Sequence, residues 1–119
     1  ELRRAMPSRL ALHYAVKANS YQPILTLFRN LVDGFDIASG GELAMTRDAG
    51  IDPAIVSFAG PGKRDDELTA AIQSGVTLNL ESENEAERAL AIAERLGQRP
   101  RLAIRVNPDF ELRGSGMKM

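Results

Sequence analysis

Five short apolar runs recur along the chain, and their starts lie 20 to 26 residues apart. Each run is rich in Leu, Ile, Val or Phe and has the length of a buried β-strand. Between the runs, apolar residues recur at the spacing of a helix that packs one face on a core. Strands that alternate with single helices predict a parallel sheet with right-handed crossovers. The predicted strands span 10–16, 35–38, 55–59, 76–80 and 102–106.

Residues that begin and end helices stand between these runs. Ser39 with Glu42, and Ser82 with Glu85, match the S-x-x-E capping box at the start of a helix. A glycine follows each helical pattern, where chains commonly leave a helix in a left-handed conformation. The capping residues and the strands therefore predict the same β-α repeat. The four glycines are Gly34, Gly50, Gly75 and Gly97.

Two architectures fit this α/β repeat. One is a complete doubly wound sheet of five strands, and the other is the first five units of a (β/α)8 barrel, which needs about 250 residues. The periodicity alone does not choose between them. The dinucleotide fingerprint G-x-G-x-x-G does not follow the first predicted strand, which weakens a nucleotide-binding doubly wound domain.

The composition narrows the class of protein and its partners. The 119 residues include 15 basic and 16 acidic side chains, and this balance gives no indication of a nucleic-acid partner. No apolar run approaches the roughly 20 residues that span a bilayer, so no membrane partner is expected. The chain has no Cys and one His, His13, which we interpret as structural, so no metal site is predicted. With no visible signal peptide, a cytoplasmic location is expected.

Polar side chains stand at the ends of the predicted strands, where parallel α/β folds bind their ligands. Lys17 directly follows the first strand. Partial desolvation at such a place lowers the pKa of a lysine and makes its neutral amine available. A neutral amine can form a Schiff base with a carbonyl or with pyridoxal phosphate. The alternative from the residues alone is a surface lysine whose stem packs while its amine stays in water.

Two acidic residues near the same edge allow more than one interpretation. Asp36 lies inside an apolar run, and a buried carboxylate needs a partner, which Lys17 or Arg105 could supply. A structural ion pair explains Asp36 equally well. Glu81 either caps the helix that follows it or faces a pocket.

Two further motifs have simple structural explanations. Ser39 and Glu42 fit a capping box better than a catalytic pair. The turn at 60–63, Gly-Pro-Gly-Lys, could hold phosphate through its backbone N–H groups. It lacks the full phosphate-loop pattern, and an ordinary tight turn explains it better.

The segment 14–19, Tyr-Ala-Val-Lys-Ala-Asn, resembles the cofactor-lysine motif of pyridoxal-phosphate enzymes with an alanine-racemase-like barrel. This fold-type III group includes the diaminopimelate, ornithine and arginine decarboxylases. The segment 35–43, Phe-Asp-Ile-Ala-Ser-Gly-Gly-Glu-Leu, resembles the next motif of the same family. The resemblance extends over the chain from residue 10 onward. Further matches follow in the family's order at 62–63, 79–82 and 105–108.

The resemblance implies a parallel (β/α)8 TIM-type barrel, of which about the first five β-α units are present. Residues 1–119 would then be part of an N-terminal pyridoxal-phosphate-binding barrel domain. The second half of the barrel and a C-terminal β-domain would lie outside them, and the fragment alone would be inactive. The segments 58–65 and 107–112 further resemble a bacterial branch associated with exosortase gene clusters. Independently of the resemblance, the residues Gly-Ser-Gly at 114–116 predict a mobile loop.

The resemblance also implies a role for each matched residue. Lys17 would form a Schiff base with pyridoxal 5'-phosphate, and Asp36 and Arg105 would line the cofactor pocket. The implied reaction is the decarboxylation of a basic or diamino amino acid by a homodimer of the full-length enzyme. Other matched residues would shape the loop beneath the cofactor or support the pocket. They are Ser39, Glu42, Lys63, Glu81 and Asn107.

Two alternative functions remain open at this point. An amino-acid racemase or a pyridoxal-phosphate carrier of the same fold type would share Lys17. A non-catalytic, five-stranded α/β binding domain would carry no covalent cofactor. Release of carbon dioxide from amino acids, compared with exchange of their α-proton, would distinguish decarboxylase from racemase.

Overall fold

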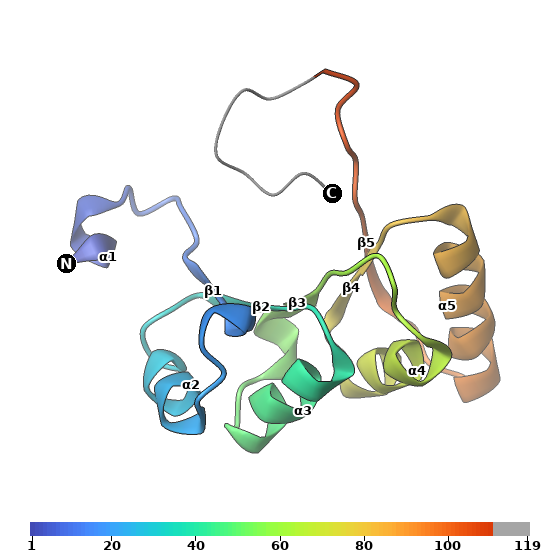
Figure 1. The fold of residues 1–119 in the computed structure, drawn as a ribbon, viewed down its shortest axis with the longest axis horizontal. Helices are drawn as coiled ribbons and strands as arrows, with labels where there is room; N and C mark the ends of the chain where they lie inside the picture. Colours follow the sequence, from blue (N-terminus) through green and yellow to red (C-terminus); the bar gives the residue numbers. More distant parts are fainter. Residues whose placement is uncertain (111–119) are drawn as a thin grey trace.

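The computed structural model describes residues 1–110, which contain a five-stranded sheet. All strands are parallel, and each pairs with its neighbours in the sequence (Figure 1). Four of the strands are shorter than the apolar runs that predicted them, and the second strand has the length of its run but begins one residue earlier. The loop expected at 114–116 lies outside the described residues. The strands are β1 (His13–Ala15), β2 (Gly34–Ile37), β3 (Val56–Phe58), β4 (Thr77–Leu80) and β5 (Arg101–Ile104).

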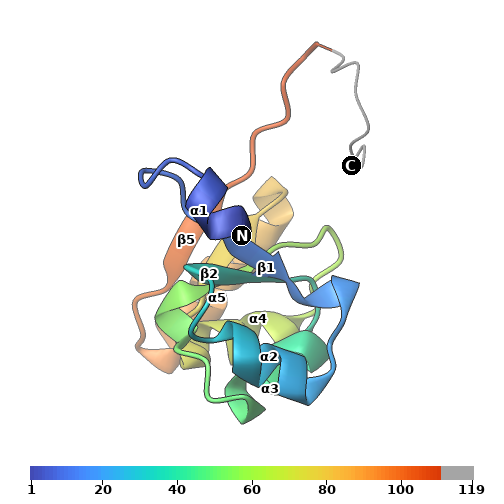
Figure 2. The same cartoon turned by 90° about the vertical axis from the view of Figure 1, so that its left-hand side faces the viewer.

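The strand order decides between the two architectures. A doubly wound sheet reverses its order at a switch point and carries helices on both faces, whereas a barrel adds each strand beside the last one. Here the order is β1-β2-β3-β4-β5, and the helices between the strands lie along one side of the curved sheet (Figure 1). The view from the β1 side shows the same arrangement (Figure 2). The fold is therefore α/β, with the first five strands of a parallel barrel.

Two helices begin at the predicted caps Ser39 and Ser82, and two end at the predicted glycines Gly75 and Gly97. Ser39 and Ser82 accept hydrogen bonds from the backbone N–H groups of Glu42 and Glu85. None of the helices in residues 1–110 is both long and apolar enough to cross a membrane. The α-helices are α1 (Leu2–Ala5), α2 (Gln22–Phe28), α3 (Gly40–Asp48), α4 (Asp65–Ser74) and α5 (Glu83–Leu96); the 3-10 helices are η1 (Val16–Ala18) and η2 (Pro53–Ile55).

The alternation of side chains along the strands separates the core from the polar face of the sheet. Phe35 and Ile37 of β2 are buried, and Asp36 between them is exposed. Phe58 and Leu78 are likewise buried among the helix side chains. Successive strand residues point to opposite faces of a sheet. Polar strand residues such as Asp36 are therefore directed away from the helix-covered core.

Gly34 is the one predicted helix-ending glycine that has another function. It lies at the start of β2, opposite His13 in the parallel register. A Cβ added to Gly34 would come within 2.5 Å of Cε1 of His13 and 2.8 Å of the backbone oxygen of Ile55. The prediction of a helix end at Gly34 is wrong. Only glycine fits here, because the imidazole ring of His13 and the backbone of Ile55 both approach the position closely.

Candidate functional site

A cleft of about 300 Å³ opens at the carboxyl ends of β1, β2 and β3. This is the edge of a parallel α/β sheet at which ligands bind. The cleft is lined by Ala15, Lys17, Asp36, Ile37, Ala38, Glu42, Ala59, Gly60 and Pro61. The structure thus brings together three side chains that the sequence selected from separate motifs, Lys17, Asp36 and Glu42.

Lys17 is positioned by the turn that ends β1. The chain passes from β1 into η1, where Val16 is fully buried and the next residue, Lys17, is exposed. Lys17 makes no hydrogen bond or ion pair with any residue in the described range 1–110. The partial desolvation predicted for Lys17 is not observed. Lys17 instead lines the cleft with no partner among residues 1–110, where its amine can meet a small molecule.

Asp36 has a different environment and partner from those predicted. Its side chain is 52% exposed, and its Oδ1 atom lies 3.0 Å from Nδ1 of His13. Neither Lys17 nor Arg105 is the partner of Asp36, so the expectation of a buried carboxylate paired with one of them is wrong. The apolar run around Asp36 is buried on one face only, and Asp36 belongs to the other. His13 is thus a direct neighbour of a cleft residue.

Ser39 and Glu42 form the predicted cap, and Glu42 also reaches the cleft. The backbone N–H of Glu42 donates to Oγ of Ser39 over 3.2 Å. The Glu42 carboxylate turns back and accepts a 2.7 Å hydrogen bond from the backbone N–H of Ala38. Because Ala38 and Glu42 both line the cleft, this cap fixes part of its wall.

The start of α3 is also connected to the start of α4. Oε1 of Glu67 accepts a hydrogen bond from the backbone N–H of Gly40, and Oε2 accepts one from that of Arg64. These two bonds, the one from Arg64 first, lower the pKa of the Glu67 carboxyl group from its usual value. Glu67 therefore holds two helix starts together as an ionised side chain.

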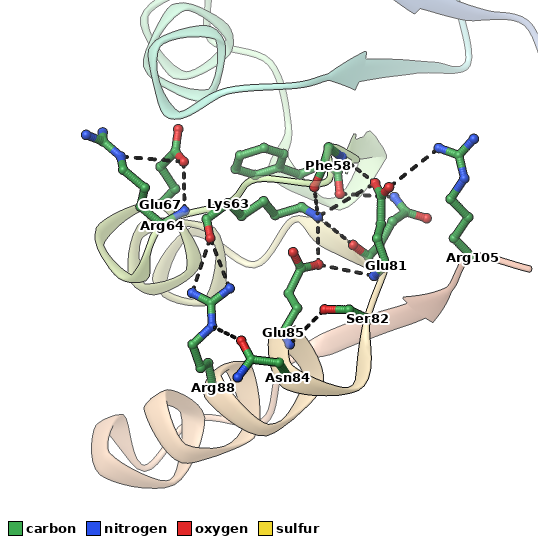
Figure 3. Close-up of polar contacts among 12 residues, drawn as sticks. Phe58, Lys63, Arg64, Glu67, Glu81, Ser82, Asn84, Glu85, Arg88 and Arg105 are labelled. Atoms are coloured by element: carbon green, nitrogen blue, oxygen red, sulfur yellow. Dashed lines mark hydrogen bonds and ion pairs between the residues drawn. The ribbon is translucent and has the colours of Figure 1, made fainter. Parts of the chain in front are cut away.

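Lys63 lies beside the cleft, in the turn between β3 and α4, and its side chain is only 1% exposed. Its Nζ donates to the backbone oxygens of Gly60 and Asn79, each over 2.7 Å (Figure 3). The third hydrogen bond of Nζ goes to Oε1 of Glu85 over 2.8 Å. Nζ also lies 5.7 Å from the ring centroid of Phe58. The turn at 60–63 is therefore closed by its own lysine and leaves no ammonium for a phosphate.

Glu81 does not cap the helix that follows it. Its carboxylate accepts a hydrogen bond from the backbone N–H of Gly60, lies 3.9 Å from Nζ of Lys63 and lies 3.7 Å from a guanidinium nitrogen of Arg105. Arg105 in turn donates to Oδ1 of Asn107 over 3.3 Å. Glu81 thus lies between Lys63 and Arg105 (Figure 3), and Asn107 is connected to it through Arg105.

Glu85 is the residue that the sequence analysis missed. The sequence motif Ser82-x-x-Glu85 predicts a capping role for Glu85. The backbone N–H of Glu85 does donate a hydrogen bond to Oγ of Ser82. The carboxylate, however, is 3% exposed and pairs with Lys63. A glutamate in the apolar stripe of an amphipathic helix is the signal that could have shown this, because a buried carboxylate needs a cation.

The site and the strand order together define this chain as the start of a parallel α/β barrel with a ligand cleft containing a lysine. The family model described as pyridoxal-dependent decarboxylase, pyridoxal binding domain, matches residues 1–118. The chain belongs to this family.

Individual relatives agree with the family match. A diaminopimelate decarboxylase of Aquifex aeolicus is 44% identical over 110 residues, covering 92% of this chain and 26% of that protein. The crystal structure of a diaminopimelate decarboxylase from Helicobacter pylori, complexed with L-lysine, has a TM-score of 0.82 and 38% identity. That match covers 90% of this chain and 28% of the other.

An arginine decarboxylase structure from Paramecium bursaria Chlorella virus, bound to agmatine, has a TM-score of 0.71 and 26% identity. The match covers 85% of this chain and 27% of the other. This chain therefore spans about a quarter of the length of the curated relatives and solved structures that it matches.

Proposed function

We propose that this chain supplies the cofactor lysine of a pyridoxal-phosphate-dependent amino-acid decarboxylase. The observation that carries the proposal is Lys17, an exposed side chain in a cleft at the carboxyl edge of the barrel strands, which has no hydrogen-bond or ion-pair partner in the part of the chain that the structure describes. Membership of the pyridoxal-dependent decarboxylase family supports it. In this proposal Lys17 would hold the cofactor covalently: its neutral amine would condense with the aldehyde group, and the carbonyl oxygen would leave as water.

The residues of the cleft fit such a group. The cleft has room for a planar ring, and the backbones that border it approach closely, since a Cβ on Gly60 would lie 3.2 Å from the backbone oxygen of Ala38. Asp36 and Glu42 place acceptors in the lining. Bound pyridoxal phosphate supplies the electron sink that makes loss of an α-carboxylate possible.

The chain's own side chains would bind and orient. Asp36, held by His13, would present its free carboxylate oxygen to the cleft, and Arg105 would bring a guanidinium to the same edge. Glu81 would fix Arg105 through their 3.7 Å contact. In this proposal Asp36 and Arg105 line the cofactor pocket, as the sequence resemblance implies.

The substrate that we propose is a basic or diamino amino acid. The relatives support this class: diaminopimelate decarboxylases are among them, one solved structure is complexed with L-lysine and another with agmatine. The proposal covers the whole protein, which we expect to be a cytoplasmic homodimer. The remaining half of the barrel and a β-domain would complete its site. Membership of the exosortase-associated branch stays a prediction.

The test uses the full-length protein and Lys17. We expect a visible absorption band with pyridoxal phosphate, and, after borohydride reduction, a pyridoxyl group on the peptide that contains Lys17. Lys17→Ala and Lys17→Arg should both lose the band, although arginine keeps the positive charge. A band retained in Lys17→Arg, or a label on the peptide of Lys63, would contradict the assignment.

The reaction is tested separately from the cofactor. Carbon dioxide release from lysine, diaminopimelate, ornithine and arginine should identify a substrate, with Lys17→Arg as the inactive control. Exchange of the α-proton without carbon dioxide release would favour the racemase alternative. Full-length protein without any absorption band would favour the binding domain.

A further inference from the structure

Two oppositely charged side chains are buried side by side at the carboxyl edge of β3 and β4. Lys63 is 1% exposed and Glu85 is 3% exposed, and Nζ and Oε1 lie 2.8 Å apart. Removing both charges from water costs several kcal/mol per ion, and well-packed apolar side chains commonly replace such pairs without loss of stability. Stability alone is therefore a poor explanation for this pair.

The ammonium group of the pair makes all the hydrogen bonds that it can donate. An ammonium group has three donors, and those of Lys63 go to Gly60, Asn79 and Glu85. Oε1 of Glu85 also accepts from the backbone N–H of Glu81 over 3.3 Å. Residues 60–63, β4 and α5 thus meet at one nitrogen atom, which fixes their relative positions.

The backbone of Lys63 is held by the same helix that holds its side chain. Both terminal nitrogens of Arg88 donate to the backbone oxygen of Lys63, each over 3.2 Å. Arg88 also contacts Asp65 at the start of α4 over 2.7 Å. One turn of α5 therefore holds both ends of Lys63, through Glu85 and Arg88 (Figure 3).

The network continues from the buried pair to the cleft. Glu81 binds the backbone N–H of Gly60, which lines the cleft, and its other carboxylate oxygen lies 3.7 Å from Arg105. Glu81 is also 3.9 Å from Nζ of Lys63, so this ammonium faces both carboxylates. The Glu81 carboxylate therefore links the buried pair to Arg105.

We propose that Lys63 and Glu85 are positioning residues, which fix the Gly60–Pro61 wall of the cleft and, through Glu81, the guanidinium of Arg105. This inference rests on the proposed function, because the positioned groups act on pyridoxal phosphate. Neither residue touches the cofactor in this arrangement. Their loss should weaken the site while the fold persists.

The experiment compares Lys63→Met and Glu85→Gln with wild type in the full-length protein. Glu94→Gln is the matched control, an exposed glutamate on the same helix. The first measurement is hydrogen exchange of the 59–64 segment without cofactor. Exchange at Gly60 should be faster in both variants and unchanged in Glu94→Gln. Unchanged exchange in both variants would overturn the proposal, whatever the enzyme does.

The second measurement is the affinity for pyridoxal phosphate, at a temperature where circular dichroism shows every variant folded. We expect a loss of about tenfold or more in both variants, by analogy with the loss seen when a residue that orients a metal ligand is removed. Wild-type affinity in folded variants with faster exchange would overturn the positioning role. If Lys63→Met does not fold, Glu85→Gln, which keeps shape and an acceptor oxygen, decides alone.

The two proposals fail in different ways. Wild-type protein without any cofactor band overturns the proposed function and this inference with it. A wild-type band with normal cofactor affinity in the folded variants overturns only the inference. The value of kcat/KM, measured with the cofactor site saturated, adds a third readout. In both variants it should stay below that of wild type, because Arg105 and the Gly60–Pro61 wall would be misplaced even when the cofactor is bound.

Discussion

The imidazole ring of His13 lies against Gly34 on the neighbouring strand, while its Nδ1 atom is 3.0 Å from Oδ1 of Asp36. The absence of a Cβ at Gly34 makes room for the ring. The ring in turn orients a carboxylate of the cleft. A glycine and a histidine that the sequence explained separately therefore act together beneath the candidate site.

Gly34→Ala should destabilise the full-length protein. The added Cβ would meet Cε1 of His13 at 2.5 Å and the backbone oxygen of Ile55 at 2.8 Å, so the strands have to shift. Overpacking of this kind costs about 1–3 kcal/mol. The free energy of unfolding, measured by urea denaturation, checks this value.

Two variants control the Gly34→Ala experiment. Gly62→Ala places its Cβ in open space, with nothing within 4 Å, and should leave stability nearly unchanged. His13→Ala combined with Gly34→Ala removes the ring contact but not the contact with Ile55, so it should recover only part of the loss. Wild-type stability in Gly34→Ala would contradict the close approach.

Phe58→Ala should have a larger effect. Phe58 is fully buried in the core beneath the cleft, at the end of β3. Truncation of a buried Phe costs about 3–5 kcal/mol, the sum of lost burial and the cavity left behind. Leu90→Ala is the control, because Leu90 is 54% exposed on α5 and should cost less than about 0.5 kcal/mol. Equal losses in the two variants would contradict the observed core.

The repeat of strands and helices was predictable because it depends on local signals. Apolar runs, the caps at Ser39 and Ser82 and the left-handed glycines Gly75 and Gly97 all act within a few residues. The strand order was not predictable from periodicity, since both candidate architectures share one pattern. The resemblance to the decarboxylase family selected the barrel, which the observed order confirms.

The candidate site was predictable only in part. Lys17 could be placed because it directly follows the first predicted strand. The carboxyl ends of parallel strands lie at the edge of the sheet where ligands bind. The partners of Asp36, Lys63 and Glu81 depend on which strands are adjacent and which face each residue occupies. The contact between Lys63 and Glu85, 22 residues apart, is tertiary. The position of Glu85 in the apolar stripe of its helix indicates burial but does not identify the cation that pairs with it. The partner of Asp36 was predicted incorrectly for the same reason, since its contact with His13 also depends on which strands are adjacent.

The carboxylate of Glu67 should make stability depend on pH. Its pKa in the folded protein lies below the usual value near 4.5, because it accepts hydrogen bonds from the backbone N–H groups of Arg64 and Gly40. A group with a lowered folded pKa contributes stability that is fully present above its unfolded pKa. The contribution is lost as the pH falls through the folded pKa.

The comparison of Glu67→Gln with wild type isolates this contribution. Above about pH 5 we expect the variant to be less stable by about 1.5 kcal/mol, the low end for hydrogen bonds to charged groups, since Gln keeps one acceptor. Below pH 4.5 the gap should narrow, because protonated Glu67 resembles the amide. Glu87→Gln is the control, an exposed residue on α5 whose stability difference from wild type should stay constant. Urea unfolding from pH 7 to about pH 3 measures both gaps. A Glu67→Gln gap that stays constant over this range would show that the ionised carboxylate does not hold the two helix starts together.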